Sequence, residues 1–428
     1  MFNPKDFIKK GCWPNGEYFN GLYFRGEDKE YHKKAMGLDY ESRDLITVND
    51  VSFFPVKDNK KYGNFIKKNP QKFLKKFNKK CLKRMNDLKQ YADKHKNDDF
   101  KNLSDEELLK EKEKFEEKVR VCIPFLFPLL FVGDIVEEDI IKKVPNIKFD
   151  EIRPIRRVSA GRMNDDLLES KKSIKELEKE YAWYNMNLTR GQPLTIDDLK
   201  EIKKSAKKTI IIKVSKNEYV KEMQKLMWFR FERIDAYNYA FYWMFPLYSE
   251  IFRRIKVAEK YWDVFLPFEL DDALISKKIP KNLDSRFTHR GVIKEDGVIR
   301  HLTIKEFERY KREFILVKEQ KDIVKGRPAC PGIVKGRVKV VKGFEDIKKI
   351  KEGNILVAAE TLVQYEPYLR KTKAMVVEIG GMLCHTAIFA REFKIPCIVG
   401  ANNATGFFKD NDLVEVDANK GIVRKINK

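Results

Sequence analysis

The stretch VVEIGGMLCHTAIFAREFKIPCIVG, residues 376–400, constrains the fold more than any other part of the sequence. It begins inside an apolar run, KAMVVEI, that has the pattern of a buried strand, and Gly380-Gly381 permits a tight turn directly afterwards. CHTAIFAREF has helical character, and Pro396 opens another apolar strand. A strand, a turn, a helix and a strand predict an α/β unit with His385 in the first helical turn.

The same alternation of short strands, helices and turns fills the rest of the C-terminal region. Turns such as KEGN, KDND and ANKG separate the apolar runs, so we predict an α/β domain over residues 326–428, close to the usual domain size. Glycine and proline gather at its entrance, where we expect a hinge over residues 320–332. The predicted strands are IVKGRVKVV, NILVAA, KAMVVEI, PCIVG, DLVEVD and GIVRKI.

Helical patterns dominate the chain before residue 320. We predict helices over residues 66–119, with Ser104 as an N-cap, over 164–187 behind an Asn or Asp cap, and over 217–262, where Pro246 should kink or divide the helix. Residues 1–65 have the composition of turns and short extended pieces. The predicted fold class is therefore α+β with several domains: a mixed segment (1–65), a helical domain (66–320) and the α/β domain (326–428).

An aromatic stripe marks the third predicted helix. Such residues at helical spacing either line a pocket for a flat ligand or fill a core, and core filling is the commoner outcome. The stripe consists of Trp228, Phe229, Phe231, Tyr237, Tyr239, Phe241, Tyr242 and Trp243.

Charge and cysteine content restrict the partners and the compartment. The formal charge of +23 favours anionic partners in general, although most of the excess is lysine of the kind that solvates helix surfaces. The six cysteines form no CxxC pair, which argues against a zinc site or a disulfide framework and fits a reducing cytoplasm. The apolar run at residues 121–136 is too short for a membrane span and holds two prolines, and we find no signal peptide.

His385 is the residue best suited to take part in a reaction. A helix N-terminus offers unpaired N–H groups and the positive end of a dipole, which suit a phosphoryl group, and the glycines allow that group to approach the backbone. A neutral imidazole nitrogen can attack phosphorus and later release the phosphoryl group. Considered by position alone, a histidine near a helix start is more often a structural or surface residue.

The residues around His385 resemble the phosphohistidine signature of the phosphoenolpyruvate-utilising enzymes, which include phosphoenolpyruvate synthase, pyruvate phosphate dikinase and rifampicin phosphotransferase. The shared order is Gly-Gly, a short spacer, the histidine, small residues, ARE, IP and VG. GRPACPGIVKGRVKVV (326–341) and NILVAAETLVQYEPYL (354–369) resemble the family's entry segment and second strand. The resemblance implies a swivelling β/β/α phosphohistidine domain in which His385 accepts the phosphoryl group, with support from Gly380, Gly381, Cys384, Thr386 and Arg391.

The sequence departs from the family pattern at several positions. Leu383 stands where many members have threonine, Phe389 replaces an aliphatic residue, and Cys330 stands where serine is usual. Leu383 and Phe389 put the rate of phosphotransfer in doubt. Cys384 matches the synthase pattern, although a small space-filling residue explains it equally well.

Full-length enzymes of this family carry a nucleotide-binding ATP-grasp domain, and some add a barrel. The sequence patterns of residues 1–320 match neither of them. YWDVFLPFELDDAL (261–274) and KEYAWYNMN (179–187) instead resemble elements of the family's helical domains, which implies a linker or acceptor-substrate domain. One cluster there is either an anion clamp or a solvated basic loop. It consists of Arg153, Arg156, Arg157 and Arg162.

These features lead to a hypothesis of a split phosphotransferase. His385 would take a phosphoryl group from ATP or phosphoenolpyruvate, bound with Mg²⁺ on a separate ATP-grasp subunit, and pass it to a small-molecule acceptor. No cofactor or metal is expected on this chain, and neither a membrane nor nucleic acid is expected as a partner. The alternative is a non-catalytic regulatory or docking protein that keeps the phosphohistidine fold. The sequence identifies neither the donor, nor the acceptor, nor the partner, nor the oligomeric state.

Overall fold

The computed structural model describes residues 2–12, 16–126, 129–145, 147, 149–152, 154, 158–186, 188–189, 192–206, 213–315, 323–342, 344–361, 365–382 and 384–426. The chain divides into two compact units. The first consists of residues 1–9, 13–143 and 154–310, and the second consists of residues 10–12, 144–153 and 311–428. The three-part division expected from the sequence stays a prediction.

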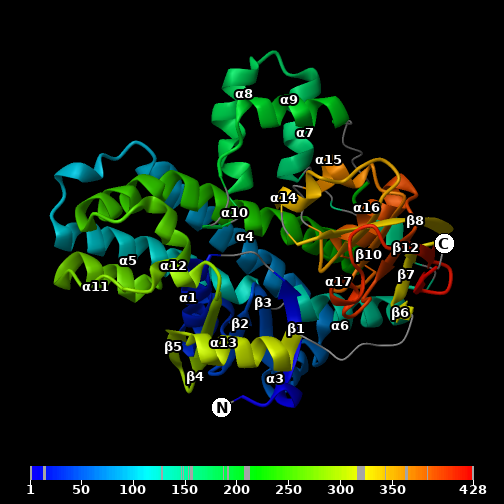
Figure 1. The fold of residues 1–428 in the computed structure, drawn as a ribbon, viewed down its shortest axis with the longest axis horizontal. Coiled ribbons are helices and arrows are strands. Elements are labelled where there is room, and N and C mark those ends of the chain that lie inside the picture. The colour runs from blue at the N-terminus through cyan, green and yellow to red at the C-terminus, as the bar shows by residue number, and fades with distance from the viewer. Residues whose placement is uncertain are drawn as a thin grey trace. The chain divides into compact units, whose positions relative to one another are not determined.

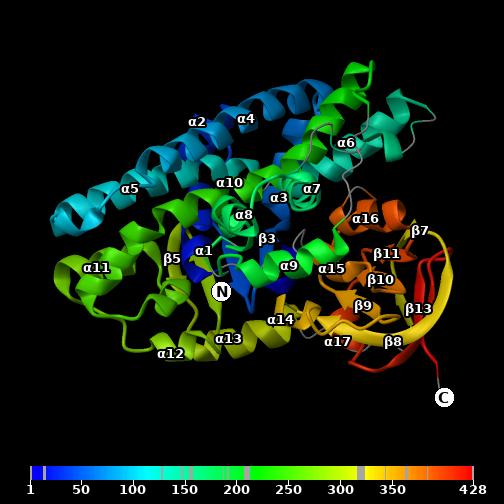
Figure 2. The same ribbon diagram turned by 90° about the horizontal axis from the view of Figure 1, so that it is seen from above.

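Two long helices, α4 (Pro70–His95) and α10 (Glu218–Ile255), pack along one another in the first unit (Figures 1 and 2). Asn69 caps α4, and Phe73, Phe77 and Cys81 form its buried stripe. Pro246 does not divide α10, contrary to one of the two predicted outcomes. The proline is exposed, so its missing N–H falls on the solvent side while the buried face on either side keeps its packing.

The other predicted helices form with adjusted ends. Ser104 caps α5 (Asp105–Cys122) in a capping box with Glu107, as predicted. The single helix expected over residues 164–187 is instead two helices, α7 (Ser159–Glu169) and α8 (Ile174–Tyr181). The break has a local cause, because Ser173 starts α8 with a capping box of its own.

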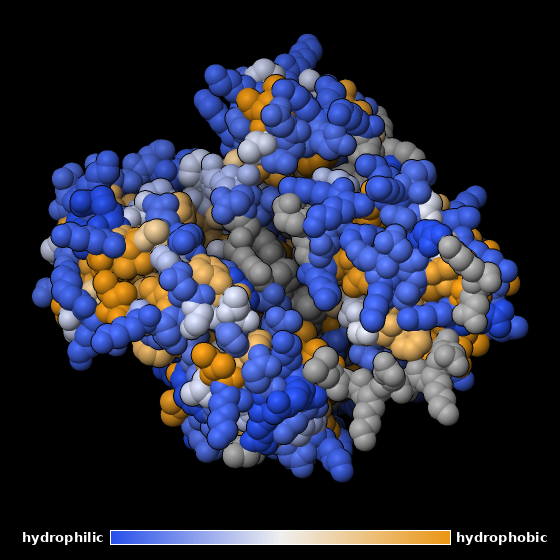
Figure 3. Space-filling view, in the orientation of Figure 1, coloured by the Kyte–Doolittle hydropathy of each residue, from blue (hydrophilic) through white to orange (hydrophobic). Residues whose placement is uncertain are grey.

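The remaining helices of this unit are short. They are α1 (Glu17–Gly26), α2 (Lys29–Met36), α3 (Val56–Lys67), α6 (Leu129–Lys143), α9 (Ile196–Ser205), α11 (Pro267–Ser276), α12 (Leu283–Arg286) and α13 (Ile304–Tyr310). Helices α1 and α2 and most of α3 lie within residues 1–65, where turns and extended pieces were expected. In the face drawn in Figure 3, hydrophobic side chains gather over α11.

A five-stranded sheet was not predicted, and its strands β2 to β5 belong to the first unit. Its strands lie in the order β1-β3-β2-β4-β5. Antiparallel pairing joins β2 to both β3 and β4, so strands about 240 residues apart in the sequence are neighbours. Tight turns with positive φ at Asn49-Asp50 and Asp296-Gly297 close the two hairpins. The strands are β1 (Phe7–Cys12), β2 (Leu45–Val48), β3 (Val51–Pro55), β4 (Gly291–Glu295) and β5 (Val298–His301).

The aromatic stripe divides between core and surface. Phe229, Tyr237 and Phe241 are buried, which agrees with core filling, and the other five side chains are partly exposed. Tyr239 packs edge to face on Trp183, with ring centroids 5.6 Å apart. The described part of the chain contains no helix with the length and apolarity needed to span a membrane.

The second unit is built on an eight-stranded sheet in the order β6-β13-β12-β8-β9-β10-β11-β7. Its centre, β8-β9-β10-β11, is parallel, and the flanking pairs are antiparallel. All six predicted strands are present, as β8 to β13. The strands are β6 (Ile323–Lys325), β7 (Arg327–Cys330), β8 (Ile333–Val341), β9 (Ile355–Ala358), β10 (Ala374–Val377), β11 (Cys397–Val399), β12 (Leu413–Asp417) and β13 (Ile422–Lys425).

Helices flank this sheet on both faces. Figure 2 shows α16 (His385–Phe393) on one side of the central strands and α17 (Ala404–Phe407) on the other. Ala387 and Ala390 are fully buried and belong to the apolar core beneath α16. Two further helices are α14 (Phe344–Ile347) and α15 (Glu366–Leu369). This mixed architecture agrees with the α+β class predicted for the chain.

Candidate phosphohistidine site

The turn between β10 and α16 depends on one of its two glycines. Gly380 has φ +127°, a conformation that side chains rarely adopt. A Cβ atom at this position would lie 2.7 Å from Sγ of Cys384, so the turn has no room for a side chain at residue 380. The carbonyl of Gly381 accepts a hydrogen bond from the Cys384 N–H (3.1 Å). The double glycine therefore fixes the point at which α16 begins.

Cys384 is the N-cap of α16. Its buried thiol accepts a long hydrogen bond from the N–H of Ala387 (3.4 Å), which satisfies one of the open N–H groups of the first turn. Cys384 was predicted to support a phosphoryl group, and the observed contact is to the helix itself. His385, the next residue, is the first of α16, as the sequence predicted.

Both ring nitrogens of His385 have hydrogen-bonding partners. Nδ1 lies 2.8 Å from Oγ1 of Thr361, and Nε2 lies 3.1 Å from Oε1 of Glu366. The hydroxyl of Thr361 is also 2.8 Å from that of buried Thr386, another residue predicted for the site. The imidazole is thus fixed between a pair of hydroxyl groups and a carboxylate.

Thr361 and Glu366 were not predicted from the sequence. Thr361 follows β9, which pairs in parallel with β10, the strand that leads to His385. The carboxyl ends of parallel strands lie at one edge of a sheet. A polar residue just after a strand next to β10 could therefore have been predicted to lie near His385. Glu366 begins the four-residue helix α15, and no pattern in the sequence pointed to it.

The other side of α16 is apolar and includes one guanidinium group. Phe389, noted as a departure from the family pattern, is buried and packs on Phe393 with centroids 4.4 Å apart. Arg370 lies over the Phe393 ring at 4.2 Å. Burial lowers the pKa of Arg370, although the charges of Glu366 and Glu392 oppose this effect. Arg391, predicted to support the site, donates to the carbonyl of Ala329 on β7 (3.5 Å).

Several predicted residues lie outside the described part of the chain. Arg153, Arg156 and Arg157 of the proposed anion clamp belong to this group, as does Leu383. Arg162, on α7 of the first unit, donates to Glu232 (3.1 Å) and to Ser159 (2.6 Å). Its guanidinium therefore contacts a buried carboxylate of α10, and the anion clamp stays a prediction.

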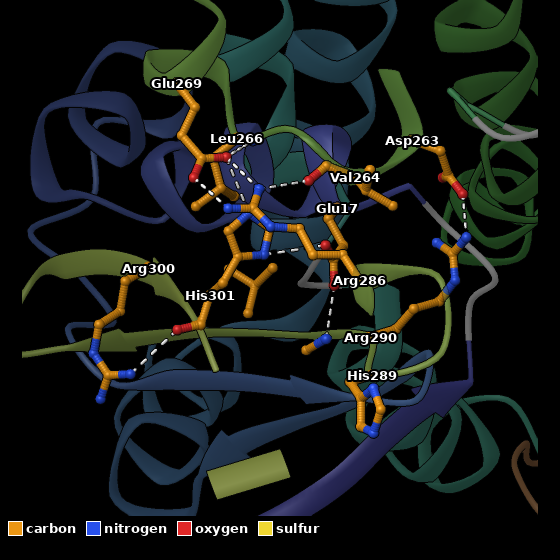
Figure 4. Close-up of polar contacts among 12 residues, drawn as sticks. Glu17, Asp263, Val264, Leu266, Glu269, Arg286, His289, Arg290, Arg300 and His301 are labelled. Carbon is orange, nitrogen blue, oxygen red and sulfur yellow. Dashed lines mark hydrogen bonds and ion pairs between the residues drawn. The ribbon is translucent and has the colours of Figure 1, made fainter. Parts of the chain in front are cut away.

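A second histidine lies in a polar cluster of the first unit (Figure 4). We call it the His301 cluster: Glu17, Asp263, Glu269, Arg286, Arg290 and His301. Nδ1 of His301 is 3.1 Å from Glu17, and Nε2 is 3.1 Å from Glu269. Arg286 forms a forked contact with Glu269 at 2.6 and 2.8 Å, and Arg290 pairs with Asp263.

Electrostatics in the His301 cluster favour an ion pair between His301 and Glu269, whereas burial raises the pKa of Glu17. Burial alone would lower the pKa of His301, but its hydrogen bonds with Glu17 and Glu269 outweigh burial and raise the pKa. Burial also opposes ionisation of Glu269, yet His301 and Arg286 lower its pKa to about 2. The cluster joins α1, α11, α12 and β5, and Glu17 also accepts from the N–H of Gly291 at the start of β4.

Comparison with known proteins matches the C-terminal part of the chain. Residues 350–421 match the family described as PEP-utilising enzyme, mobile domain. A probable phosphoenolpyruvate synthase of Methanothermobacter thermautotrophicus is 40% identical over 107 residues, which cover 25% of this chain and 16% of that protein. The phosphoenolpyruvate synthase of Pyrococcus furiosus is 39% identical over 137 residues, covering 31% of this chain and 17% of that protein.

The rifampicin phosphotransferase of Bacillus cereus is 34% identical over 166 residues, which cover 39% of this chain and 18% of that protein. The matched part of the chain thus spans less than a fifth of each of these three relatives. The matches confirm the resemblance stated from the sequence: the C-terminal part of this chain carries the mobile domain of the phosphoenolpyruvate-utilising enzymes.

Proposed function

We propose that this chain is a phosphotransferase component in which His385 carries a phosphoryl group. The observation that carries the proposal is the placement of its imidazole at the start of α16, with Nδ1 against the hydroxyl of Thr361. A hydroxyl that holds the proton of Nδ1 makes Nε2 the atom for attack on phosphorus once its contact with Glu366 is released. The open N–H groups of the first helical turn supply the positive potential that a transferred phosphoryl group needs.

The reaction follows from this arrangement. Nδ1 keeps its proton and donates it to Oγ1 of Thr361 in a hydrogen bond, and the lone pair on Nε2 attacks the phosphorus atom of the donor. The N–P bond forms while the P–O bond of the donor breaks, and the leaving oxygen keeps the electron pair. The second transfer reverses these roles, because a nucleophilic oxygen of the acceptor displaces Nε2.

The donor and acceptor sites belong to the same proposal. The donor is ATP or phosphoenolpyruvate, held with Mg²⁺ on a separate subunit, and the acceptor is a small molecule bound by the first unit. Support comes from the small part of the synthases and of rifampicin phosphotransferase that the chain matches. Movement of the mobile domain would carry His385 between the two sites. The hinge expected over residues 320–332 does not fit the described residues, because β6 (Ile323–Lys325) and β7 (Arg327–Cys330) pair within the sheet of the second unit. The cytoplasm is the expected compartment, since the sequence has no CxxC pair and the five cysteines whose side chains the structure describes form no disulfide.

A second candidate is a docking or regulatory module that keeps the fold without phosphotransfer. The contact between Nε2 of His385 and the carboxylate of Glu366 favours it, because a carboxylate repels an incoming phosphoryl group. The two candidates differ in one observable property, which is whether a phosphoryl group ever becomes attached to His385.

The test is intact-mass analysis after incubation with ATP or phosphoenolpyruvate and Mg²⁺, with cell extract as the source of a partner. We expect one acid-labile phosphoryl adduct on the native chain and none on His385→Ala. His289→Ala is the matched control, since His289 lies in the first unit and its side chain is 30% exposed. If the folded native chain forms no adduct with either donor, the carrier function is wrong and the docking module remains.

A further inference from the structure

Glu366 contacts the ring nitrogen that the proposed reaction requires. Its Oε1 lies 3.1 Å from Nε2 of His385, and the two side chains are 25% and 13% exposed. On the opposite side of the ring, Thr361 lies 2.8 Å from Nδ1 and from Oγ1 of Thr386. The proton of the Thr361 hydroxyl can therefore point either at the ring or at Thr386.

These contacts restrict where the imidazole carries its protons. When Thr361 donates to Nδ1, the neutral ring carries its proton on Nε2 and donates it to Glu366. When Thr361 donates to Thr386, it accepts from a protonated Nδ1. A bare Nε2 lone pair would then face the oxygen of Glu366, so this arrangement is the less favourable of the two. In the favourable arrangement, Nε2 carries the proton and has no lone pair for attack.

We propose that Glu366 is a positioning residue that keeps a proton on Nε2 of His385, so that the carrier is unreactive until this carboxylate is displaced. The phosphoryl step in this statement rests on the proposed function, whereas the position of the proton does not. Removing Glu366 should therefore activate His385 and not impair it, which is the opposite of what a supporting residue would do.

The surroundings of Glu366 allow such a displacement. Glu366 is the first residue of a helix of only four residues, so a change of rotamer there disturbs little packing. Arg370, at the C-terminal end of the same helix, already experiences the charges of Glu366 and Glu392. It offers the displaced carboxylate a partner of opposite charge.

The activated reaction balances without any further reagent. As Glu366 moves away, the ring releases its Nε2 proton to water, and Nδ1 takes a proton from water and holds it in a hydrogen bond to Oγ1 of Thr361. The Nε2 lone pair then attacks phosphorus as the P–O bond of the donor breaks, and the displaced donor oxygen keeps the electron pair.

The first test measures the proton position without any phosphoryl donor. The chain has only five histidines, so ¹⁵N-histidine labelling gives few signals, and His385→Ala assigns those of His385. Long-range ¹H–¹⁵N correlation at neutral pH should show a protonated Nε2 in the native chain. In Glu366→Ala, we expect the proton to move to Nδ1. Identical His385 nitrogen shifts in the two proteins would overturn the proposal.

The second test measures the rate of adduct formation in the intact-mass assay. Hydrogen bonds to charged groups are strong, so Glu366→Ala and Glu366→Gln should each form the adduct at least about tenfold faster than the native chain. Glu392→Gln is the matched control, because it removes a negative charge near Arg370 without a contact to Nε2. An unchanged or slower rate in both Glu366 variants would contradict the proposal.

The two tests separate this inference from the proposed function. If no variant forms an adduct, the carrier function fails, and the nitrogen shifts still decide where Glu366 places the proton. Circular dichroism of each variant checks folding. Since Glu366→Gln keeps the size of the side chain, it replaces Glu366→Ala in the first test if the alanine variant does not fold.

Discussion

His385 and His301 have the same side chain and nearly the same small exposure, 13% and 11%, yet their surroundings differ in kind. His301 lies between two carboxylates, and an arginine neutralises one of them. His385 faces one carboxylate and one hydroxyl at the start of a helix. Burial alone therefore does not distinguish a structural histidine from a reactive one; the neighbours on both ring nitrogens do.

The difference also extends to what each histidine connects. His301, on β5, contacts Glu269 of α11 and Glu17 of α1, which lies far from both in the sequence, so its contacts stabilise the first unit as a whole. His385 contacts residues that follow adjacent parallel strands of one sheet. We expect substitutions in the His301 cluster to reduce stability, and substitutions around His385 to alter reactivity.

The largest expected effect is that of Glu269→Gln. Glu269 contacts Arg286, His301 and the N–H of Leu266, so its loss leaves buried positive charge without a partner. We expect the free energy of unfolding of the first unit to fall by about 3 to 5 kcal/mol. All five tryptophans precede residue 311, so tryptophan fluorescence in a urea titration follows this unit alone.

His385→Ala is the counterpart of that substitution. This substitution leaves no buried charge without a partner. We therefore expect it to lower the free energy of unfolding of the second unit by less than about 1 kcal/mol. If His385→Ala proves as destabilising as Glu269→Gln, then His385 is also a structural residue and the contrast between the two histidines fails.

Gly380→Ala should have the next largest effect. The new Cβ would lie 2.7 Å from Sγ of Cys384, in a backbone conformation unfavourable for alanine. We expect a loss of about 1 to 3 kcal/mol in the second unit, measured by circular dichroism, and a lower rate of adduct formation. Gly353→Ala is the control, since Gly353 also has positive φ but open space around it. Equal losses in the two variants would show that only backbone strain matters.

The pH dependence of stability should separate the two units. The folded pKa of His301 lies above its usual value of 6.5, so its contribution is complete below that value and is lost as pH rises through the folded pKa. The free energy of unfolding of the first unit should fall by at most about 1.4 kcal/mol per pH unit in that range. His301→Gln should remove this slope in urea titrations between neutral and alkaline pH, and an unchanged slope would place its origin elsewhere.

A small change in stability, similar to that of His385→Ala, is expected of Thr361→Val. The substitution keeps the shape but removes the hydroxyl from Nδ1 of His385, which should cost about 0.5 to 1.5 kcal/mol in the second unit. Adduct formation should slow by about tenfold, because Nδ1 loses the group that accepts its proton. The intact-mass assay measures the rate. An unaffected rate would mean that Thr361 only packs against the ring.

The sequence predicted the second unit better than the first for physical reasons. Its strands are short, apolar and separated by recognisable turns, so each can be recognised locally. The first unit pairs β2 with β4, and no local pattern reports a pairing across about 240 residues. The position of His385 followed from the glycine turn, whereas Glu366 became visible only after folding brought α15 to the ring.

The distant pairing of β2 with β4 has a consequence for synthesis of the chain. On the ribosome, residues 45–48 emerge long before residues 291–295, so the edge of β2 that later receives β4 stays without its partner during most of translation. The central parallel strands of the second unit, by contrast, all lie within residues 333–399. A chaperone that shields exposed strand edges should therefore bind the nascent first unit and have little effect on the second.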